Sequence, residues 1–292
     1  MNDRISRAIR RGGPGFSLAK WEKTVYHNTL LYKTIPNRKE GAGLETLTSR
    51  KNALIRHIRE LSDNGEYRRA QGLYLCDGMK TLREALRFGA KVVSVLWRDG
   101  AQNVDGLDGC EQYIAPGDLF DYASPMKNSP GPLFTVAIRG CGKPGRLDNA
   151  IVLENVQDPG NVGTVIRTAN ALNIGAVILT GACADLYQPK TVRATMGAIF
   201  RQNVIRIERE YLRDFLHDQG LPLYGAALSE KACDLRGLSL KHAAVAIGSE
   251  GQGLSAELLR LCDGELIIPM NPDSESLNAA VAASIVMWEM AR

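Results

Sequence analysis

The sequence predicts an α/β fold in which a parallel-sheet domain follows a smaller α/β domain. The second half of the chain contains continuous apolar runs of strand length, separated by helical patterns, as expected for a parallel sheet covered on both faces. A glycine-rich segment at residues 140–145 divides these runs from a shorter set of strands and helices. The 292 residues, of which 45% are apolar and 23% charged, are enough for one large or two ordinary domains.

Residues 1–45 are a basic extension, which we expect to be a flexible arm. Residues 1–70 carry 15 Lys and Arg against 7 Asp and Glu. Because the whole chain has a formal charge of +4, the remainder is mildly acidic. A basic arm on an acidic body favours an anionic polymer such as nucleic acid as partner. The alternative is a solvated charged surface.

Residues 46–140 are the first predicted domain. Leu54, Ile55, Ile58 and Leu61 fall at helical spacing. Asp77 is the expected N-cap of a following helix, which Gly89 ends. The expected strands are residues 72–76, 92–97 and 133–138, and the expected helices are 77–88 and 116–127.

Residues 147–292 are the second predicted domain. In the last helix Leu277, Val281, Ile285 and Trp288 share one stripe, and the neighbouring alanines permit close packing. The expected strands are residues 151–156, 176–180, 223–227, 244–248 and 266–269, and the clearest helices are 162–172 and 277–290.

The first motif whose residues suit binding or catalysis spans residues 155–169 and joins a strand to a helix. Pro159 and Gly160 make the turn, and Asn161 is the expected N-cap. Gly163 permits close backbone approach, and Arg167 can clamp a phosphate. The alternative is an ordinary strand–turn–helix with a surface arginine.

Two further motifs follow later strands. The glycines of residues 248–253 match neither the dinucleotide-binding order nor the P-loop order, which leaves a glycine loop with one carboxylate, Glu250. The alternative for this motif is a tight turn before a helix. Residues 267–279 carry a polar loop onto the last helix. There Ser276 or Asn278 either caps the helix or binds a ligand.

Together the three motifs resemble the SpoU (TrmH-like) branch of the SPOUT RNA methyltransferases, over roughly residues 147–292. Asn161 and Arg167 match the first family motif, Gly248 and Glu250 the second, and Ser276-Leu277-Asn278 the third. The resemblance implies a deep trefoil knot formed by the C-terminal segment, a pocket for S-adenosylmethionine, and a homodimer through the knotted domain. Residues 46–140 resemble a small RNA-binding domain of ribosomal-protein type.

One departure from the family pattern is Pro272, at a position where relatives often have glycine. Proline fixes φ and lacks a donor, so we expect the loop before Ser276 to differ in shape.

The resemblance also implies a reaction and the residues that perform it. The expected reaction is methyl transfer to a ribose 2′-hydroxyl of RNA. Arg167 holds a neighbouring phosphate and stabilises the developing alkoxide, since a guanidinium stays protonated. Asn161 orients Arg167 or the ribose, Glu250 holds Arg167, and Ser276 and Asn278 complete the polar wall. The expected cofactor-binding residues are Thr180, Gly181, Gly248, Ile268, Met270 and Leu277.

The substrate expected from the resemblance is ribosomal RNA, with transfer RNA second. The alternatives are an inactive RNA-binding or ribosome-assembly factor with the same fold, and a small-molecule methyltransferase, which the basic front half disfavours. Candidates for phosphate contacts are Arg50, Lys51, Arg56, Arg59, Arg68 and Arg69.

No metal is expected, because neither the histidines nor the six cysteines have ligand spacing. The chain has no long apolar run and no secretory signal, which favours a cytoplasmic protein without membrane association.

Overall fold

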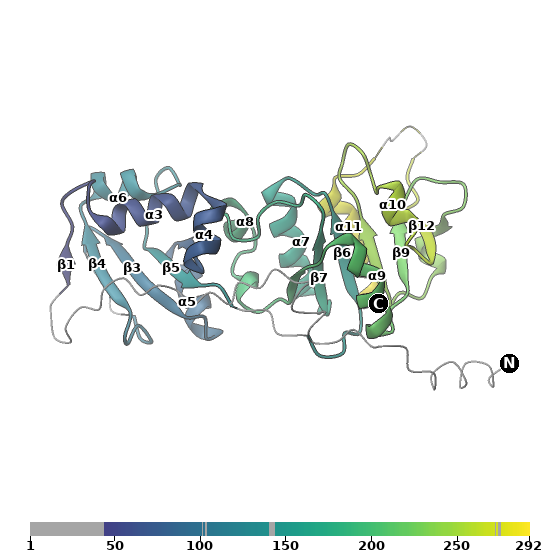
Figure 1. The fold of residues 1–292 in the computed structure, drawn as a ribbon, viewed down its shortest axis with the longest axis horizontal. Coiled ribbons are helices and arrows are strands. Elements are labelled where there is room, and N and C mark those ends of the chain that lie inside the picture. Colours follow the sequence, from purple (N-terminus) through teal and green to yellow (C-terminus); the bar gives the residue numbers. More distant parts are fainter. Residues whose placement is uncertain (1–43, 101, 103, 140–143, 272, 274–275) are drawn as a thin grey trace.

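The computed structural model describes residues 44–292, except 101, 103, 140–143, 272, 274 and 275. Figure 1 shows two sheets, each with its own helices, and α8 lies between them. The expected basic arm lies outside the described residues apart from Leu44 and Glu45, and so do Pro272 and most of the glycine-rich segment.

The first sheet has five described strands in the order β1-β4-β3-β5-β2. β5 runs antiparallel to β2 and β3, and the other pairs are parallel. Apolar side chains of α3 and α6 cover one face of the sheet, and those of α5 cover the other. The elements are β1 (Glu45–Thr46), α3 (Ala53–Asp63), α4 (Gly65–Gln71), β2 (Leu73–Asp77), α5 (Met79–Arg87), β3 (Val92–Arg98), β4 (Glu111–Ala115), α6 (Gly117–Ala123) and β5 (Leu133–Ala137).

The predicted strands and the helix with the Leu54–Leu61 pattern are confirmed here, but the prediction for α5 is wrong at its start. α5 begins after Gly78 and has no side-chain cap. Asp77 instead accepts a hydrogen bond of 2.6 Å from Ser129 Oγ. α6 is also shorter than predicted, because Ser124 already has an extended backbone.

The second sheet has seven described strands in the order β10-β12-β9-β11-β6-β7-β8, and every pair is parallel. The predicted parallel sheet is therefore confirmed. Its strands are β6 (Ala150–Glu154), β7 (Ala176–Thr180), β8 (Val204–Arg206), β9 (Leu223–Ala226), β10 (Cys233–Asp234), β11 (Ala244–Ile247) and β12 (Gly264–Ile267).

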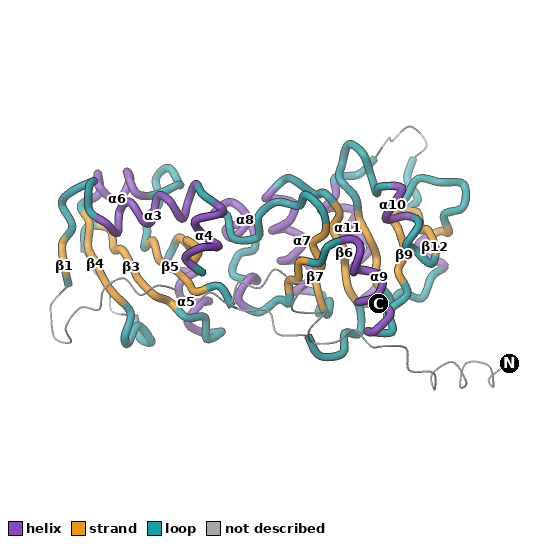
Figure 2. The backbone as a smooth tube through the Cα atoms, in the orientation of Figure 1, coloured by secondary structure: helices purple, strands orange, loops and turns teal. Residues whose placement is uncertain are grey.

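Helices lie on both faces of this sheet (Figure 2). α7 and α11 pack on one face, where Leu153, Val245 and Ile166 are buried together. α9 and α10 pack on the other, around Phe215 and Leu258. The helices are α7 (Pro159–Ala171), α8 (Pro189–Ala194), α9 (Arg209–Gln219), α10 (Ala256–Leu259) and α11 (Ala279–Ala291), with 3₁₀ turns η1 (Ala198–Phe200) and η2 (Leu235–Gly237).

The apolar stripe predicted on the last helix does not face the core throughout. Ala283, Val286 and Met287 make the buried side of α11, whereas Val281 is 47% exposed and Trp288 is 61% exposed. Ala279 and Ala280 are also buried, so small alanines and larger side chains share the buried side of the helix.

The two sheets are joined through α8. Gly163 of α7 lies so close to α8 that a Cβ there would be 2.4 Å from Ala194 Cβ, which confirms the predicted close approach. On its other side, Val192 of α8 packs with Tyr74 and Cys76 of β2 in one cluster. Arg68 of α4 adds an ion pair to Asp185 at 2.6 Å.

Candidate functional site

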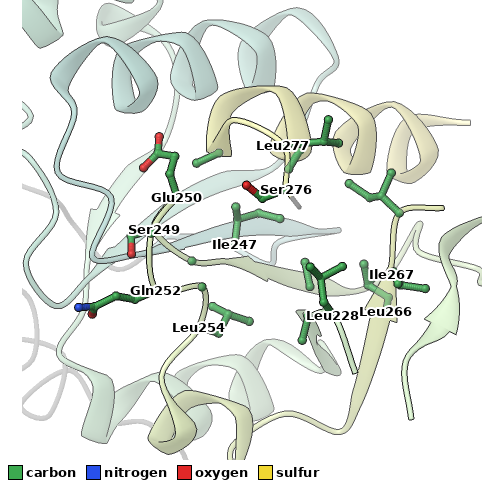
Figure 3. A pocket seen from close by; sticks show the side chains of 18 of the residues that line it. Leu228, Ile247, Ser249, Glu250, Gln252, Leu254, Leu266, Ile267, Ser276 and Leu277 are labelled. Carbon is green, nitrogen blue, oxygen red and sulfur yellow. The ribbon is translucent and has the colours of Figure 1, made fainter. Parts of the chain in front are cut away.

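A cavity of about 480 Å³ lies at the carboxyl ends of β9, β11 and β12. Carboxyl ends of parallel strands are the usual ligand crevice of open α/β sheets. Its walls are the segment after β9, the glycine loop after β11 and, between β12 and α11, Ile268, Met270, Ser276 and Leu277. In Figure 3, Ser249 and Glu250 lie towards one end, Leu228 and Ile267 towards the other, and Ser276 faces the loop.

The glycine loop owes its shape to Gly248. The loop folds back on itself, since Ser249 bridges Gly253 and the Gly253 N–H donates to the Ser249 carbonyl at 2.9 Å. A Cβ on Gly248 would be 2.0 Å from Gly253 C and 2.4 Å from Leu254 N. Only glycine fits there, so this close approach explains why the motif has glycine at residue 248.

The three motifs meet through a chain of side-chain hydrogen bonds. Asn161 donates from Nδ2 to Glu250 Oε1, and Asn278 donates from Nδ2 to Asn161 Oδ1 at 3.2 Å. Asn278 also caps α11, accepting from the N–H groups of Ala280 and Val281. Of the two interpretations offered for Asn278, the helix cap is confirmed, and ligand binding stays a prediction. The three polar turns, far apart in sequence, therefore converge.

The predicted N-cap of the first motif is wrong by three residues. Asp158, not Asn161, caps α7, and its Oδ1 accepts from the Asn161 N–H at 2.9 Å. This hydrogen bond, with a smaller contribution from Lys190, lowers the pKa of the Asp158 carboxyl. Capping by Asp158 leaves the Asn161 side chain free to point at Glu250.

Arg167 lies apart from this cluster. It is exposed on α7, six residues beyond Asn161 and about 9 Å further along the helix axis. No hydrogen bond or ion pair joins it to another residue in the described part of the chain. The expected contact from Glu250 to Arg167 is therefore not seen, because Glu250 binds Asn161 instead.

The predicted cofactor residues separate into two groups. Gly248, Ile268, Met270 and Leu277 line the cavity, as does the predicted catalytic Ser276. Thr180 and Gly181 do not. Thr180 ends β7 and Gly181 follows it, and β7 is two strands away from β11 and so about 10 Å from it.

The structure adds lining residues that sequence reasoning missed. Ala226 ends β9, Ala227 and Leu228 come directly after it, and Leu254 follows Gly253 of the glycine loop. The sequence predicts the strand at residues 223–227, and the carboxyl end of that strand is a signal for lining residues. The missing information was the strand order, which places β9 beside β11.

The predicted RNA-contact residues fall into an exposed group and one buried residue. Lys51, Arg56 and Arg69 are exposed, and so are Arg50 and Arg59, whose guanidinium groups lie 4.5 Å and 4.4 Å from the ring centre of Tyr122. Their exposed positions leave these five side chains accessible.

Arg68 is a correction to the predicted RNA contacts. Its side chain is 5% exposed, pairs with Asp185 and donates to the carbonyls of Leu61 and Ser62. Buried against the other domain, it is not accessible to a nucleic acid.

Other site chemistries find no support among the described residues. No group of three or more His, Cys, Asp or Glu in this part of the chain could hold a metal ion. Burial raises the pKa of the Cys183 thiol, and it raises the pKa of Cys262 to about 12, so neither is an activated nucleophile. No helix within the described ranges is long and apolar enough to cross a membrane.

Comparison with known proteins places this site in a family. Residues 148–288 match the model of the SpoU rRNA Methylase family. The 23S rRNA (guanosine(2553)-2'-O)-methyltransferase RlmP of Bacillus subtilis (strain 168) is 30% identical over 248 residues, which cover 85% of this chain and 99% of the relative.

Solved structures of methyltransferases are also similar to this chain. The AdoMet-bound rRNA methyltransferase of Sinorhizobium meliloti has a TM-score of 0.76 at 25% identity, covering 85% of this chain and 97% of that one. The SpoU methyltransferase AviRb of Streptomyces viridochromogenes, in complex with the cofactor AdoMet, has a TM-score of 0.73 at 27% identity, covering 82% and 98%. These similarities extend over both sheets.

Proposed function

Because this chain belongs to the SpoU rRNA methylase family, we propose that it transfers a methyl group from S-adenosylmethionine to a ribose 2′-hydroxyl of ribosomal RNA. The observation that carries the proposal is that the three motifs meet beside one cavity: Glu250 lines the cavity, and Asn161 and Asn278 are joined to it in a continuous chain of hydrogen bonds. A shared cavity is what a reaction between two bound substrates requires.

The cavity fits the cofactor in size and chemistry. A volume of about 480 Å³ lies within the range of about 300–1,000 Å³ found for small-molecule sites. Ile268, Met270 and Leu277 offer apolar contacts, and the folded-back glycine loop presents backbone groups. Glu250 adds a negative charge at the wall, which favours a cationic ligand. S-adenosylmethionine, when bound, supplies a methyl group activated by a sulfonium.

The polar residues have separate tasks in this proposal. Asn161 and Asn278 keep Glu250 at one place on the cavity wall, and Ser276 faces the same space. Arg167 has no partner in the described chain, so its charge is available to an RNA phosphate beside the reacting ribose. There it stabilises negative charge on the 2′-oxygen without acting as a base.

Ribosomal RNA is the proposed substrate class. Two similar proteins, RlmP and the Sinorhizobium meliloti protein, are named as rRNA methyltransferases, and each comparison covers 85% of this chain. We propose that the five-stranded domain binds RNA through Arg50, Lys51, Arg56, Arg59 and Arg69. Exposed arginines beside Tyr122 suit phosphate contacts and stacking on unpaired bases. Transfer RNA remains the second candidate.

We also propose that the chain forms a homodimer through its second domain. Val281 and Trp288 are exposed, and with Ile285 they line a shallow surface cavity of about 440 Å³ that also contacts Asn161 and Asn278. An apolar patch of this kind on a soluble chain favours a protein partner. Analytical ultracentrifugation of Trp288→Asp tests this proposal: the variant is expected to sediment as a monomer.

The trefoil knot belongs to the same proposal. The glycine loop after β11 and the segment from β12 to α11 enclose one cavity, which is consistent with threading of the C-terminal segment past that loop. The ribosomal-protein type of the first domain and a cytoplasmic location are proposed with it.

Transfer of tritium from labelled S-adenosylmethionine to ribosomal and transfer RNA tests the function. Digestion to nucleosides is expected to give labelled 2′-O-methylribose from ribosomal RNA. Label on a base would show that the acceptor is wrong, and label on transfer RNA alone would show that the substrate class is wrong. Binding of cofactor and RNA without any transfer would favour the inactive-factor alternative.

A further inference from the structure

Glu154 is the one fully buried carboxylate among the described residues, and no step above uses it. It ends β6, immediately before the first motif, and its side chain is 0% exposed. Both oxygens are engaged. Oε2 accepts from the Ser255 N–H and Oε1 from Ser255 Oγ, each at 2.8 Å, and Oε1 also lies 2.8 Å from Arg209 Nη2. A buried carboxylate is tolerated when such charge-assisted hydrogen bonds satisfy it.

Ser255 is the residue at which the glycine loop ends. Leu254, immediately before it, lines the cavity, and Ser255 caps α10 immediately after the loop. At its start the loop is held by the close packing of Gly248 on Gly253. Along its course it is held by the hydrogen bond from Asn161 to Glu250. Glu154 therefore holds the loop at a third place, Ser255, where the loop ends.

We propose that Glu154 is a positioning residue for the cofactor: by fixing Ser255 it sets the shape of the glycine loop that forms one wall of the cavity. The inference rests on the proposed function, since it takes S-adenosylmethionine as the ligand. The loop is then held by two side chains of the same strand–helix segment, Asn161 and Glu154. The segment from β6 to α7 thus contacts the glycine loop at Glu250 through Asn161 and at Ser255 through Glu154.

The physical basis is preorganisation. A loop that is already in its binding conformation loses no affinity to ordering, whereas a loop that holds this conformation for a tenth of the time binds about tenfold more weakly. Glu154→Gln keeps the size of the side chain but turns one acceptor into a donor, which opposes either the Ser255 N–H or the Arg209 guanidinium. The end of the loop at Ser255 then populates more than one conformation.

The test is calorimetric titration of S-adenosylmethionine into the full chain and three variants, with a thermal melt of each. Glu154→Gln is expected to bind about tenfold more weakly than the unchanged chain. Ser255→Ala, which keeps the backbone N–H, is expected to lose less. Asn149→Ala is the matched control, because this buried residue precedes the opposite end of β6 and bonds Gly175 and Lys241. It is expected to melt earlier but to bind the cofactor unchanged.

A kinetic readout separates positioning from general destabilisation. In Glu154→Gln the KM for the cofactor is expected to rise while kcat at saturating cofactor stays near that of the unchanged chain. Unchanged affinity in Glu154→Gln, or an equal loss in Asn149→Ala, overturns the inference. If Glu154→Gln does not fold, unchanged affinity in Ser255→Ala overturns it. Failure of the unchanged chain to bind the cofactor instead refutes the proposed function.

Discussion

Replacing Gly248 with alanine perturbs the cavity wall by one methyl group. The new Cβ would lie 2.0 Å from Gly253 C and 2.1 Å from Gly253 O, and ordinary contact begins at 3.4 Å. The backbone on the returning side of the loop must therefore move by about 1.4 Å, the difference between these distances. Backbone atoms cannot rotate away as a side-chain end does. Overpacking of this kind costs about 1–3 kcal/mol of folding free energy.

The functional loss is expected to exceed the loss of stability. A misplacement of about 1 Å near reacting groups can lower the rate about 100-fold. We therefore expect Gly248→Ala to lose cofactor affinity in calorimetry and to lower kcat/KM for RNA methylation by about that factor. The matched control is Gly251→Ala in the same loop, where a Cβ would meet nothing within 4 Å. Cofactor affinity unchanged in Gly248→Ala, or lost equally in Gly251→Ala, would refute the reasoning.

Three further predictions concern single side chains. Arg167→Ala should abolish tritium transfer while leaving cofactor affinity nearly unchanged in calorimetry; parallel loss of both would make Arg167 structural. Asp158→Ala should cost about 1 kcal/mol of stability at pH 7 as a lost helix cap. Because the folded-state pKa of Asp158 lies below its ordinary 3.8, this difference should shrink as melts are taken from pH 4 downwards, and a constant difference would contradict it. Asp185→Ala should destabilise the chain by up to about 3 kcal/mol, since it leaves the buried charge of Arg68 unpaired. Lys190→Ala, which removes an exposed pair, should cost less than about 1 kcal/mol. Denaturant titration of both variants measures the two losses, and equal losses would contradict the burial of Arg68 as the cause.

Helix capping and strand prediction show where local reasoning succeeds and fails. The apolar runs at β6, β7 and β11 were visible because every residue there is buried on both faces of the sheet. β4 and β8 were missed, because their short sequences mix polar and apolar residues. Asp158 and Asn161 are both good caps, and only the observed turn selects Asp158.

The motifs and the alternation of strands and helices were determined by the sequence alone, since hydrophobic periodicity, glycine and capping residues act over a few neighbours. Tertiary structure decided what depends on distant neighbours. It placed β9 beside β11, so that residues 226–228 reach the cavity and Thr180 does not. It also buried Arg68 against Asp185 and turned Trp288 outwards. The reason is that a side chain's exposure and partner are set by the packing of whole elements, which no local pattern encodes.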